Sequence, residues 1–300
     1  MFSFTKKQDI IEIGNVTLGG QPGQLPTVLI GGLFFSGTPD FETAEKEIKE
    51  MYLLSEKTGN PGIPDFFIKK NEFIDDIITF IQQKLPLKVP FSIDVTDPIV
   101  KVNVLEKLDD AHLLQRTIYN SIHVGITDDE LQALKKHTPN TAILVAFNPK
   151  DTSPDGKIEV LETGAHIISN GLFDIAKTCH IRNILVDTAA LAPGQNSGAS
   201  IAAIPVLKEE YGLPTGCAIH NVVEKSSWLN IFSEEKKFVD SASNININLF
   251  GGDFAIYGPI KQAKEVFPVM SWQDILISEY TENYFGIEPI EQHPRRKLLQ

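Results

Sequence analysis

Short runs of apolar and β-branched residues recur along the chain about every 25 to 35 residues, as buried strands do. Eight strands are predicted, at residues 26–35, 64–70, 90–96, 116–122, 140–148, 183–190, 214–221 and 253–260. The segments between them repeat apolar residues with a helical period. Helices are predicted at residues 41–59, 71–85, 98–114, 127–137, 171–180, 197–212 and 226–242. The fourth has a clear start, because Thr127 precedes three acidic residues as in a capping box.

The alternation of strands and helices predicts a parallel sheet that helices cover on both faces. Eight such units can close into a (β/α)8 TIM barrel, which takes about 250 residues, whereas six or fewer would favour an open doubly wound sheet. An open dinucleotide-binding sheet also needs a glycine-rich first turn. Gly31 and Gly32 are instead followed by bulky apolar residues, so the GxGxxG motif is absent. We therefore expect residues 1–300 to form a single TIM-barrel domain.

The two ends of the chain lie outside this repeating pattern. Residues 1–25 alternate apolar and polar positions around Gly14-Asn15, which predicts a β-hairpin that covers the N-terminal end of the barrel. The basic segment at residues 293–300 (HPRRKLLQ) is expected to fray.

Composition excludes several classes of function. The net charge of −12 and the pI of about 5.1 argue against nucleic-acid and anionic-membrane binding, because phosphate binding needs clustered Lys and Arg. No segment has 18 uncharged apolar residues in a row, and the first residues lack the apolar core of a signal peptide. Cys179 and Cys217 are too few and too scattered for a disulfide framework or a zinc site. A cytoplasmic protein is expected.

Polar residues follow five successive predicted strands, at the point where each strand ends. They are Asp94, Asn120, Asn148, Asp187 and the pair His220-Asn221. In a TIM barrel the C-terminal ends of the strands form one face, and the active site lies there. A single Asp or Asn after a strand is usually the N-cap of the next helix. Five in succession favour a ligand whose several donors and acceptors these side chains bind together.

Two other kinds of barrel chemistry are less well supported. Lys69 and Lys70 are an adjacent charged pair that leads into a polar helix start, whereas a Schiff-base lysine needs an apolar pocket or a cationic neighbour. The histidines form neither HxH nor HExxH, so no metal site is expected. His220 differs from the other histidines because it adjoins a candidate site residue.

Three motifs carry a resemblance to a known family: GGQPGQLPT (19–27), AFNPKD (146–151) and GLPTGCAIHN (212–221). With similar segments along nearly the whole chain, they resemble the H subunit of tetrahydromethanopterin S-methyltransferase. They equally resemble the bacterial methylcorrinoid:tetrahydrofolate methyltransferases of the glycine betaine demethylation type. The polar strand ends are more distantly similar to those of pterin-binding barrels such as dihydropteroate synthase. The resemblance implies a TIM barrel of the pterin-binding type.

The resemblance also implies roles for individual residues. Asp94, Asn120 and Asp187 would hold a reduced pterin, Asn148 would be a further contact, and Asn221 would lie near N5 of the pterin. The N3–H and exocyclic NH2 of the pterin are paired donors that suit one carboxylate, and the family pattern favours Asp187 for them. A carboxamide such as Asn120 suits O4 and N8–H.

The expected reaction moves a methyl group from a methyl-Co(III) corrinoid, carried as methylcobalamin by a corrinoid-binding protein, to N5 of tetrahydrofolate. The products are methyltetrahydrofolate and Co(I). The nucleophile is the amine of the substrate, so the enzyme must position N5 and handle its proton. Asn221 and Asp94 are the expected catalytic residues: Asn221 would hydrogen-bond N5, and Asp94, His220 or a water would relay the proton.

Three alternatives stay open at this point. The first is the same transfer with tetrahydromethanopterin, which shares the recognition edge. The second is a non-catalytic pterin-binding subunit of a methyltransferase complex. The third, pteroate synthesis, needs Lys and Arg at the later strand ends, which offer none.

Aromatic residues in the region of the last two barrel helices bear on assembly. They are Trp228, Phe232, Trp272 and Tyr280. Barrels of the family type that the chain resembles commonly pair, so these exposed-looking residues predict a homodimer; ordinary packing between helix and barrel is the alternative.

Overall fold

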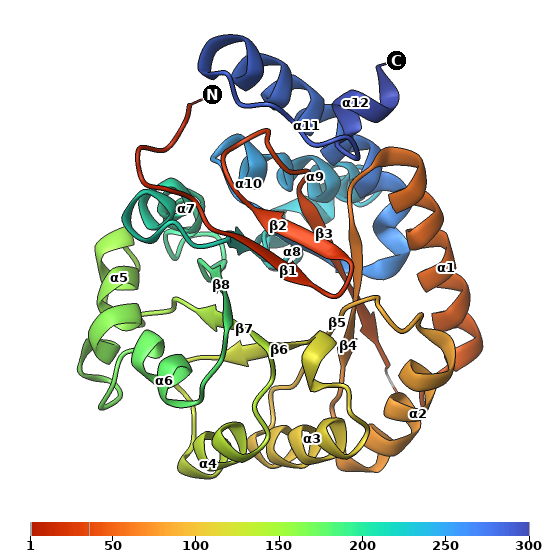
Figure 1. Ribbon diagram of the computed structural model, residues 1–300, viewed down its shortest axis with the longest axis vertical. Helices are drawn as coiled ribbons and strands as arrows, with labels where there is room; N and C mark the ends of the chain where they lie inside the picture. The colour runs from red at the N-terminus through yellow and green to blue at the C-terminus, as the bar shows by residue number, and fades with distance from the viewer. Residues whose placement is uncertain (1, 36, 300) are drawn as a thin grey trace.

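Eight parallel strands close into a barrel that a ring of helices surrounds (Figure 1). This computed structural model describes residues 2–35 and 37–299. Each strand pairs with the next along the chain, and the last pairs with the first. The barrel strands are β3 (Val28–Phe34), β4 (Gly62–Phe67), β5 (Phe91–Asp94), β6 (Thr117–Ile122), β7 (Thr141–Val145), β8 (Asn183–Asp187), β9 (Thr215–Cys217) and β10 (Phe254–Pro259). The predicted TIM barrel and its eight strands are confirmed.

Most of the predicted helices are present. The α-helices are α1 (Phe41–Thr58), α2 (Ile74–Lys84), α3 (Pro98–Asp110), α4 (Asp128–Lys136), α5 (Pro154–Thr163), α6 (Leu172–Thr178), α7 (Ser197–Tyr211), α8 (His220–Glu224), α9 (Lys236–Ser243), α10 (Ile245–Leu249), α11 (Ala263–Phe285) and α12 (Pro294–Leu298). The single helix predicted at 226–242 is instead a 3-10 turn, η4 (Ser227–Phe232), followed by α9. The predicted helices did not include α5, in which Pro154 and Gly156 obscure the helical pattern, and they also did not include α8, α10, α11 and α12. No described helix is long and apolar enough to cross a membrane.

The predicted N-terminal hairpin is confirmed as β1 (Ile10–Ile13) and β2 (Val16–Gly19), and it lies across one end of the barrel (Figure 1). Ile13, Val16 and Leu18 are buried in one apolar cluster with residues of the barrel strands. Gly14 makes the turn at φ +60°, where a Cβ would lie 2.2 Å from the carbonyl oxygen of Lys88. Burying each large apolar side chain contributes about 1.5–3 kcal/mol, so the hairpin closes the bottom of the barrel firmly.

The C-terminal segment does not fray as expected. It forms the short helix α12, which packs against α11. His293 is buried and caps the helix, accepting from the backbone N–H of Arg295 at 3.1 Å. Arg295 and Arg296 both pair with Glu282 of α11, and Arg295 also donates to the carbonyl of Ser278 at 2.7 Å. The basic residues therefore dock the tail on an acidic helix, and the prediction of a frayed tail is wrong.

Helix α4 begins as predicted, although only half of the capping box forms. The hydroxyl of Thr127 accepts from the backbone N–H of Glu130 at 3.2 Å. The side chain of Glu130 does not reach back to the cap. It turns into the protein and accepts from Lys101 at 2.9 Å and from the Tyr119 hydroxyl at 2.8 Å. This buried ion pair joins α3 and α4 behind strand β6.

Candidate functional site

Two predicted site residues lie side by side at the C-terminal end of the barrel. Strand β5 ends at Asp94, and its Cα partner on the neighbouring strand β6 is Asn120. Residues paired in this way on parallel strands project to the same face of the sheet. The structure therefore brings Asp94 and Asn120 together, as the sequence predicted.

A third residue of this group was missed by the sequence analysis. Asp65, in the interior of β4, is 2% exposed and is the Cα partner of Ser92 on β5. Burial raises the pKa of Asp65 to about 6, although the side chains of Ser92 and Asn120, which can donate to it, lower it again. Its Oδ1 has no hydrogen-bond partner within the described part of the chain.

Asp65 and Asp94 influence each other electrostatically. The pKa of Asp94 is raised to about 8, first by burial and second by the like charge of Asp65, while Lys101 lowers it. Two carboxylates that share a poorly solvated site cannot both ionise easily, so the pair retains a proton near neutral pH. This is the property that a group exchanging protons with a substrate needs.

Lys101 supports this wall of the site from behind. It is buried on α3, and its Nζ donates to the backbone carbonyl of Ser121 at 2.7 Å and to Glu130 at 2.9 Å. Ser121 directly follows Asn120, so the Lys101–Glu130 pair fixes the backbone beside the predicted carboxamide. We regard Lys101 as a residue that positions the site.

Asp187 ends strand β8, between β7 and β9 of the barrel. Its Oδ1 accepts from the backbone N–H of Ala189 at 2.8 Å. Burial raises the pKa of Asp187 to about 6, opposed by that hydrogen bond and by the positive charge of Lys157. Lys157 is a fully buried residue of α5, and burial lowers its own pKa. Asp187 is thus a buried carboxylate at the mouth, as predicted, with a lysine behind it that the sequence analysis missed.

The sequence nevertheless contained a signal for both buried lysines. Lys101 precedes Val104 and Leu105 at helical spacing, and Lys157 precedes Val160 and Leu161 in the same way. A lysine on the apolar stripe of a helix points toward the barrel, whereas a lysine on the polar face points into solvent. Asp65 had a weaker signal, since it lies inside a strand rather than at its end.

Asn148 is held by its own loop. The strand predicted to end there, β7, ends at Val145. The Asn148 side chain is buried; its Oδ1 accepts from the N–H groups of Lys150 and Asp151, and its Nδ2 donates to the carbonyl of Gly156. These bonds shape the turn into α5. The second N–H of the amide has no hydrogen-bond partner among the residues that the structure describes.

Asn221 is not at the end of a strand, which corrects the prediction. Strand β9 ends at Cys217, and Asn221 lies in the short helix α8, where its side chain is exposed. The buried residues Ala218 and Ile219 extend the apolar run past the strand, so the sequence pattern continues where the hydrogen-bonded ladder has stopped. Asn221 still follows β9 directly and therefore lies on the C-terminal side of the barrel.

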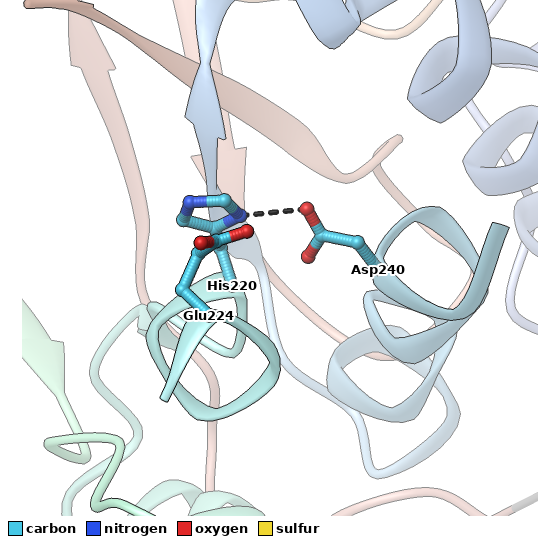
Figure 2. A group of neighbouring side chains, drawn as sticks. All are labelled: His220, Glu224 and Asp240. Atoms are coloured by element: carbon cyan, nitrogen blue, oxygen red, sulfur yellow. Dashed lines mark hydrogen bonds and ion pairs between the residues drawn. The ribbon is translucent and has the colours of Figure 1, made fainter. Parts of the chain in front are cut away.

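His220, the neighbour of Asn221, points toward a different partner. Its Nδ1 lies 2.7 Å from Oδ2 of Asp240 on α9. Its ring packs against Gly258 of β10, where a Cβ would lie 2.4 Å from the ring carbon Cγ. Figure 2 shows that Glu224, one helical turn after His220, lies next to the same ring.

The mouth of the barrel therefore carries the buried carboxylates of Asp65 and Asp187, the half-buried carboxylate of Asp94 and a carboxamide. Asp65 and Asp94 lie with Asn120 on β4 to β6, and Asp187 lies on β8. Within the described ranges, none of the three carboxylates forms an ion pair. Buried carboxylates without cationic partners are costly for stability, and such groups cluster at functional sites. They suit a ligand that presents several N–H donors.

Comparison with solved structures defines the class of fold. The chain is similar to Yersinia pestis DHPS bound to a pterine-sulfa conjugate, with a TM-score of 0.59 and 12% identity over 88% of this chain and 98% of that chain. The chain thus shares the TIM-barrel fold of that structure.

Residues 6–290 match the tetrahydromethanopterin S-methyltransferase MtrH subunit family. The chain is 36% identical over 320 residues to the H subunit of tetrahydromethanopterin S-methyltransferase from Methanothermobacter thermautotrophicus. It is also 36% identical over 313 residues to the H subunit of the putative methyltransferase mtx of Methanosarcina barkeri. Each comparison covers 100% of both chains. The chain belongs to the MtrH family.

Proposed function

We propose that this chain binds a reduced pterin at the C-terminal mouth of its barrel and transfers a methyl group between a corrinoid and N5 of the pterin. The observation that supports the proposal is the group of poorly solvated carboxylates, with Asn120, at the C-terminal mouth of an MtrH-family barrel. A reduced pterin offers several ring N–H donors and an exocyclic amine, which fit these acceptors. The unpartnered Oδ1 of Asp65 is a further acceptor of this kind.

Asp187 is proposed to accept the paired N3–H and NH2 donors of the pterin. A carboxylate can accept two parallel hydrogen bonds only when it is ionised. Lys157 favours that ionised form through its positive charge, although burial acts in the opposite direction. Asn120 would pair with O4 or N8–H from the neighbouring wall, and Asn148 is proposed as a minor contact through its remaining N–H.

The chemistry at N5 needs a proton acceptor. The N5 amine attacks the methyl group, the carbon–cobalt bond breaks with its electron pair left on cobalt as Co(I), and N5 loses a proton. Asp94 is proposed to accept that proton in its ionised form, because a pKa raised to about 8 makes it a stronger base than an exposed carboxylate. Asn221 is proposed to hydrogen-bond N5 and to stabilise its changing charge without titrating.

The identity of the pterin is the finer part of the proposal. The sequence analysis favoured tetrahydrofolate, and that preference is not confirmed. The relatives whose names specify a pterin are tetrahydromethanopterin S-methyltransferase subunits, so tetrahydromethanopterin is now the better supported acceptor. Tetrahydrofolate remains the alternative.

Partners follow from the same names. The named relatives are subunits, which supports a multisubunit partnership, with a corrinoid-binding protein as the proposed methyl donor.

A homodimer remains a separate prediction. Trp228, Phe232 and Trp272 are exposed, while Tyr280 is half-buried and stacks on Tyr284. A monomeric mass in light scattering across a wide concentration range would contradict the dimer. The cytoplasmic location also remains a prediction.

Single-turnover methyl transfer tests the proposed function. The chain is mixed anaerobically with methylcob(III)alamin and an excess of either tetrahydromethanopterin or tetrahydrofolate, and Co(I) formation is followed by absorbance. The expected result is faster transfer to tetrahydromethanopterin. If pterin binds but no methylcorrinoid yields Co(I), the chain is a non-catalytic pterin-binding subunit and the proposed reaction is wrong.

A further inference from the structure

Three potential metal ligands lie together on the helices that follow β9. His220 and Glu224 are one turn apart on α8, and Asp240 reaches them from α9 (Figure 2). One ligand atom from each residue lies within 4.8 Å of those from the other two. This arrangement is separate from the carboxylates of the mouth, and the proposed methyl transfer does not use Glu224 or Asp240.

Asp240 provides an independent sign that something binds here. It is 2% exposed, and its carboxylate faces His220 and Glu224 (Figure 2). Oδ2 lies 2.7 Å from Nδ1 of His220, but the buried Oδ1 has no partner among the residues that the structure describes. An orphaned carboxylate oxygen in the interior is costly unless a hydrogen bond or a metal ion satisfies it.

We propose that His220, Glu224 and Asp240 form a binding site for a divalent transition-metal ion, with Zn²⁺ as the first choice. One imidazole nitrogen and two carboxylates are a donor set that Zn²⁺ accepts, with bonds of about 2.0–2.2 Å and a fourth position left for water. The metal would bind the His220 imidazole and the Asp240 carboxylate, satisfy its orphaned Oδ1, and tie α8 to α9. It thereby fixes η4, which connects the two helices beside the barrel mouth.

Lys236 is the group that competes with the metal. Its Nζ lies 3.2 Å from Oε2 of Glu224. A simple Asp–His hydrogen bond with a surface salt bridge is therefore the arrangement without metal. In the arrangement without metal, Lys236 pairs with Glu224 at the surface, and such a pair contributes little to stability. In the arrangement with metal, Lys236 competes with the metal for the same carboxylate.

Competition titration of the chain without a tag distinguishes the arrangement with metal from the arrangement without metal. After dialysis against a chelator, Zn²⁺ is titrated in the presence of a chromophoric competitor. The expected result is one Zn²⁺ per chain, at least about tenfold weaker binding in Glu224→Gln and His220→Gln, and tighter binding in Lys236→Ala. Glu224 is exposed, so Glu224→Gln should keep the fold, and Glu234→Gln, a nearby exposed glutamate, is the matched control.

Thermal melting gives a second measurement that needs no pterin or corrinoid. Zn²⁺ should raise Tm of the wild type and of Glu234→Gln, but not of Glu224→Gln, because a ligand stabilises only the folded state that binds it. The site is refuted if the chain binds no Zn²⁺ against the competitor. It is equally refuted if Glu224→Gln and His220→Gln bind Zn²⁺ as tightly as Glu234→Gln does.

Discussion

The buried charges at the two ends of the barrel differ in whether they have an oppositely charged partner. At the N-terminal end, Lys208 of α7 is fully buried and lies 2.5 Å from Asp253. Lys208 also donates to the carbonyl of Gly20, and Asp253 accepts from the backbone N–H of Thr215. At the C-terminal mouth, Asp65 and Asp94 lie on neighbouring strands, and the charge of Asp65 raises the pKa of Asp94.

The difference separates residues that hold the fold from residues that serve a site. At the closed end each buried charge has an opposite partner and further hydrogen bonds, which offsets the cost of removing it from water. At the mouth none of the three carboxylates forms an ion pair within the described residues, although the charges of Lys101 and Lys157 lower the pKa values of Asp94 and Asp187. Burial raises the pKa of these carboxylates, as it does that of Asp253, but only Asp253 has a bonded counter-charge. Substitutions should therefore lower stability at the closed end and lower binding or rate at the mouth.

The largest effect on stability is expected from Asp253→Ala. It leaves the buried ammonium of Lys208 without its counter-charge, and breaking a buried pair in this way costs about 3–5 kcal/mol. Urea unfolding, followed by circular dichroism, measures the loss. Lys49→Ala, which breaks the exposed pair with Glu45, is the control and should leave the midpoint unchanged. If both variants unfold at the same urea concentration, the closed end does not depend on this pair.

Asn221→Ala should lower the rate of methyl transfer far more than it lowers pterin affinity. N5 changes charge between the ground state and the transition state, whereas the recognition edge of the pterin does not. Losing a hydrogen-bonding group aimed at developing charge typically costs about 10²-fold to 10³-fold in rate. The measurements are single-turnover Co(I) formation and calorimetric pterin binding. Asn230→Ala, an exposed residue of η4, is the control; equal losses of rate and affinity in Asn221→Ala would remove Asn221 from the N5 end.

Asp187→Ala should show the reverse pattern, with weak pterin binding and a smaller loss of rate at saturating pterin. Leaving the paired donors of the pterin without an acceptor costs on the order of 2–4 kcal/mol of binding. Asp187→Asn is the matched variant, since it can still accept from the N–H of Ala189 but cannot accept two bonds from the pterin. Calorimetry with each pterin measures both. Unchanged affinity in a folded Asp187→Ala protein would refute the assignment.

The sequence predicted the barrel, its eight strands, the hairpin, and the mouth positions of Asp94, Asn120 and Asp187. These features follow from local signals, namely apolar periodicity and the residue type at a strand end. The end of β9 was placed wrongly because Ala218 and Ile219 are buried without being in a strand, and apolar periodicity cannot distinguish the two.

Other errors concern interactions between distant segments. Asp65 was missed because its importance depends on Asp94, a neighbour across the sheet rather than along the chain. The docked tail was missed because its arginines are satisfied by Glu282 of another helix. Asp240 lies 20 residues after His220, and no local sequence pattern predicts that the two side chains are in contact. Predicting such pairs requires the folded arrangement itself.

The smallest effect, and the one of opposite sign, is expected from Asp94→Asn, which should stabilise the protein at alkaline pH. The pKa of Asp94 is raised to about 8 in the folded state, above its ordinary value near 4, so the folded state favours the protonated form. The stability that this protonation provides is fully present below pH 4 and is lost as the pH rises through 8. Asn stays neutral, so it removes the repulsion from Asp65, with a gain of about 1–2 kcal/mol at pH 9 that vanishes toward pH 4.

Melting temperatures measured from pH 4 to pH 9 test this sign. The wild type should lose stability relative to Asp94→Asn as the pH rises, and Asp110→Asn, which removes an exposed carboxylate at the end of α3, should follow the wild type. A fall in the melting temperature of Asp94→Asn at pH 9 would mean that the Asp94 carboxylate is satisfied in the folded protein. Asp94 at the mouth would then have stabilising partners, as Asp253 has at the N-terminal end, and the proposed difference between the two ends of the barrel would be wrong.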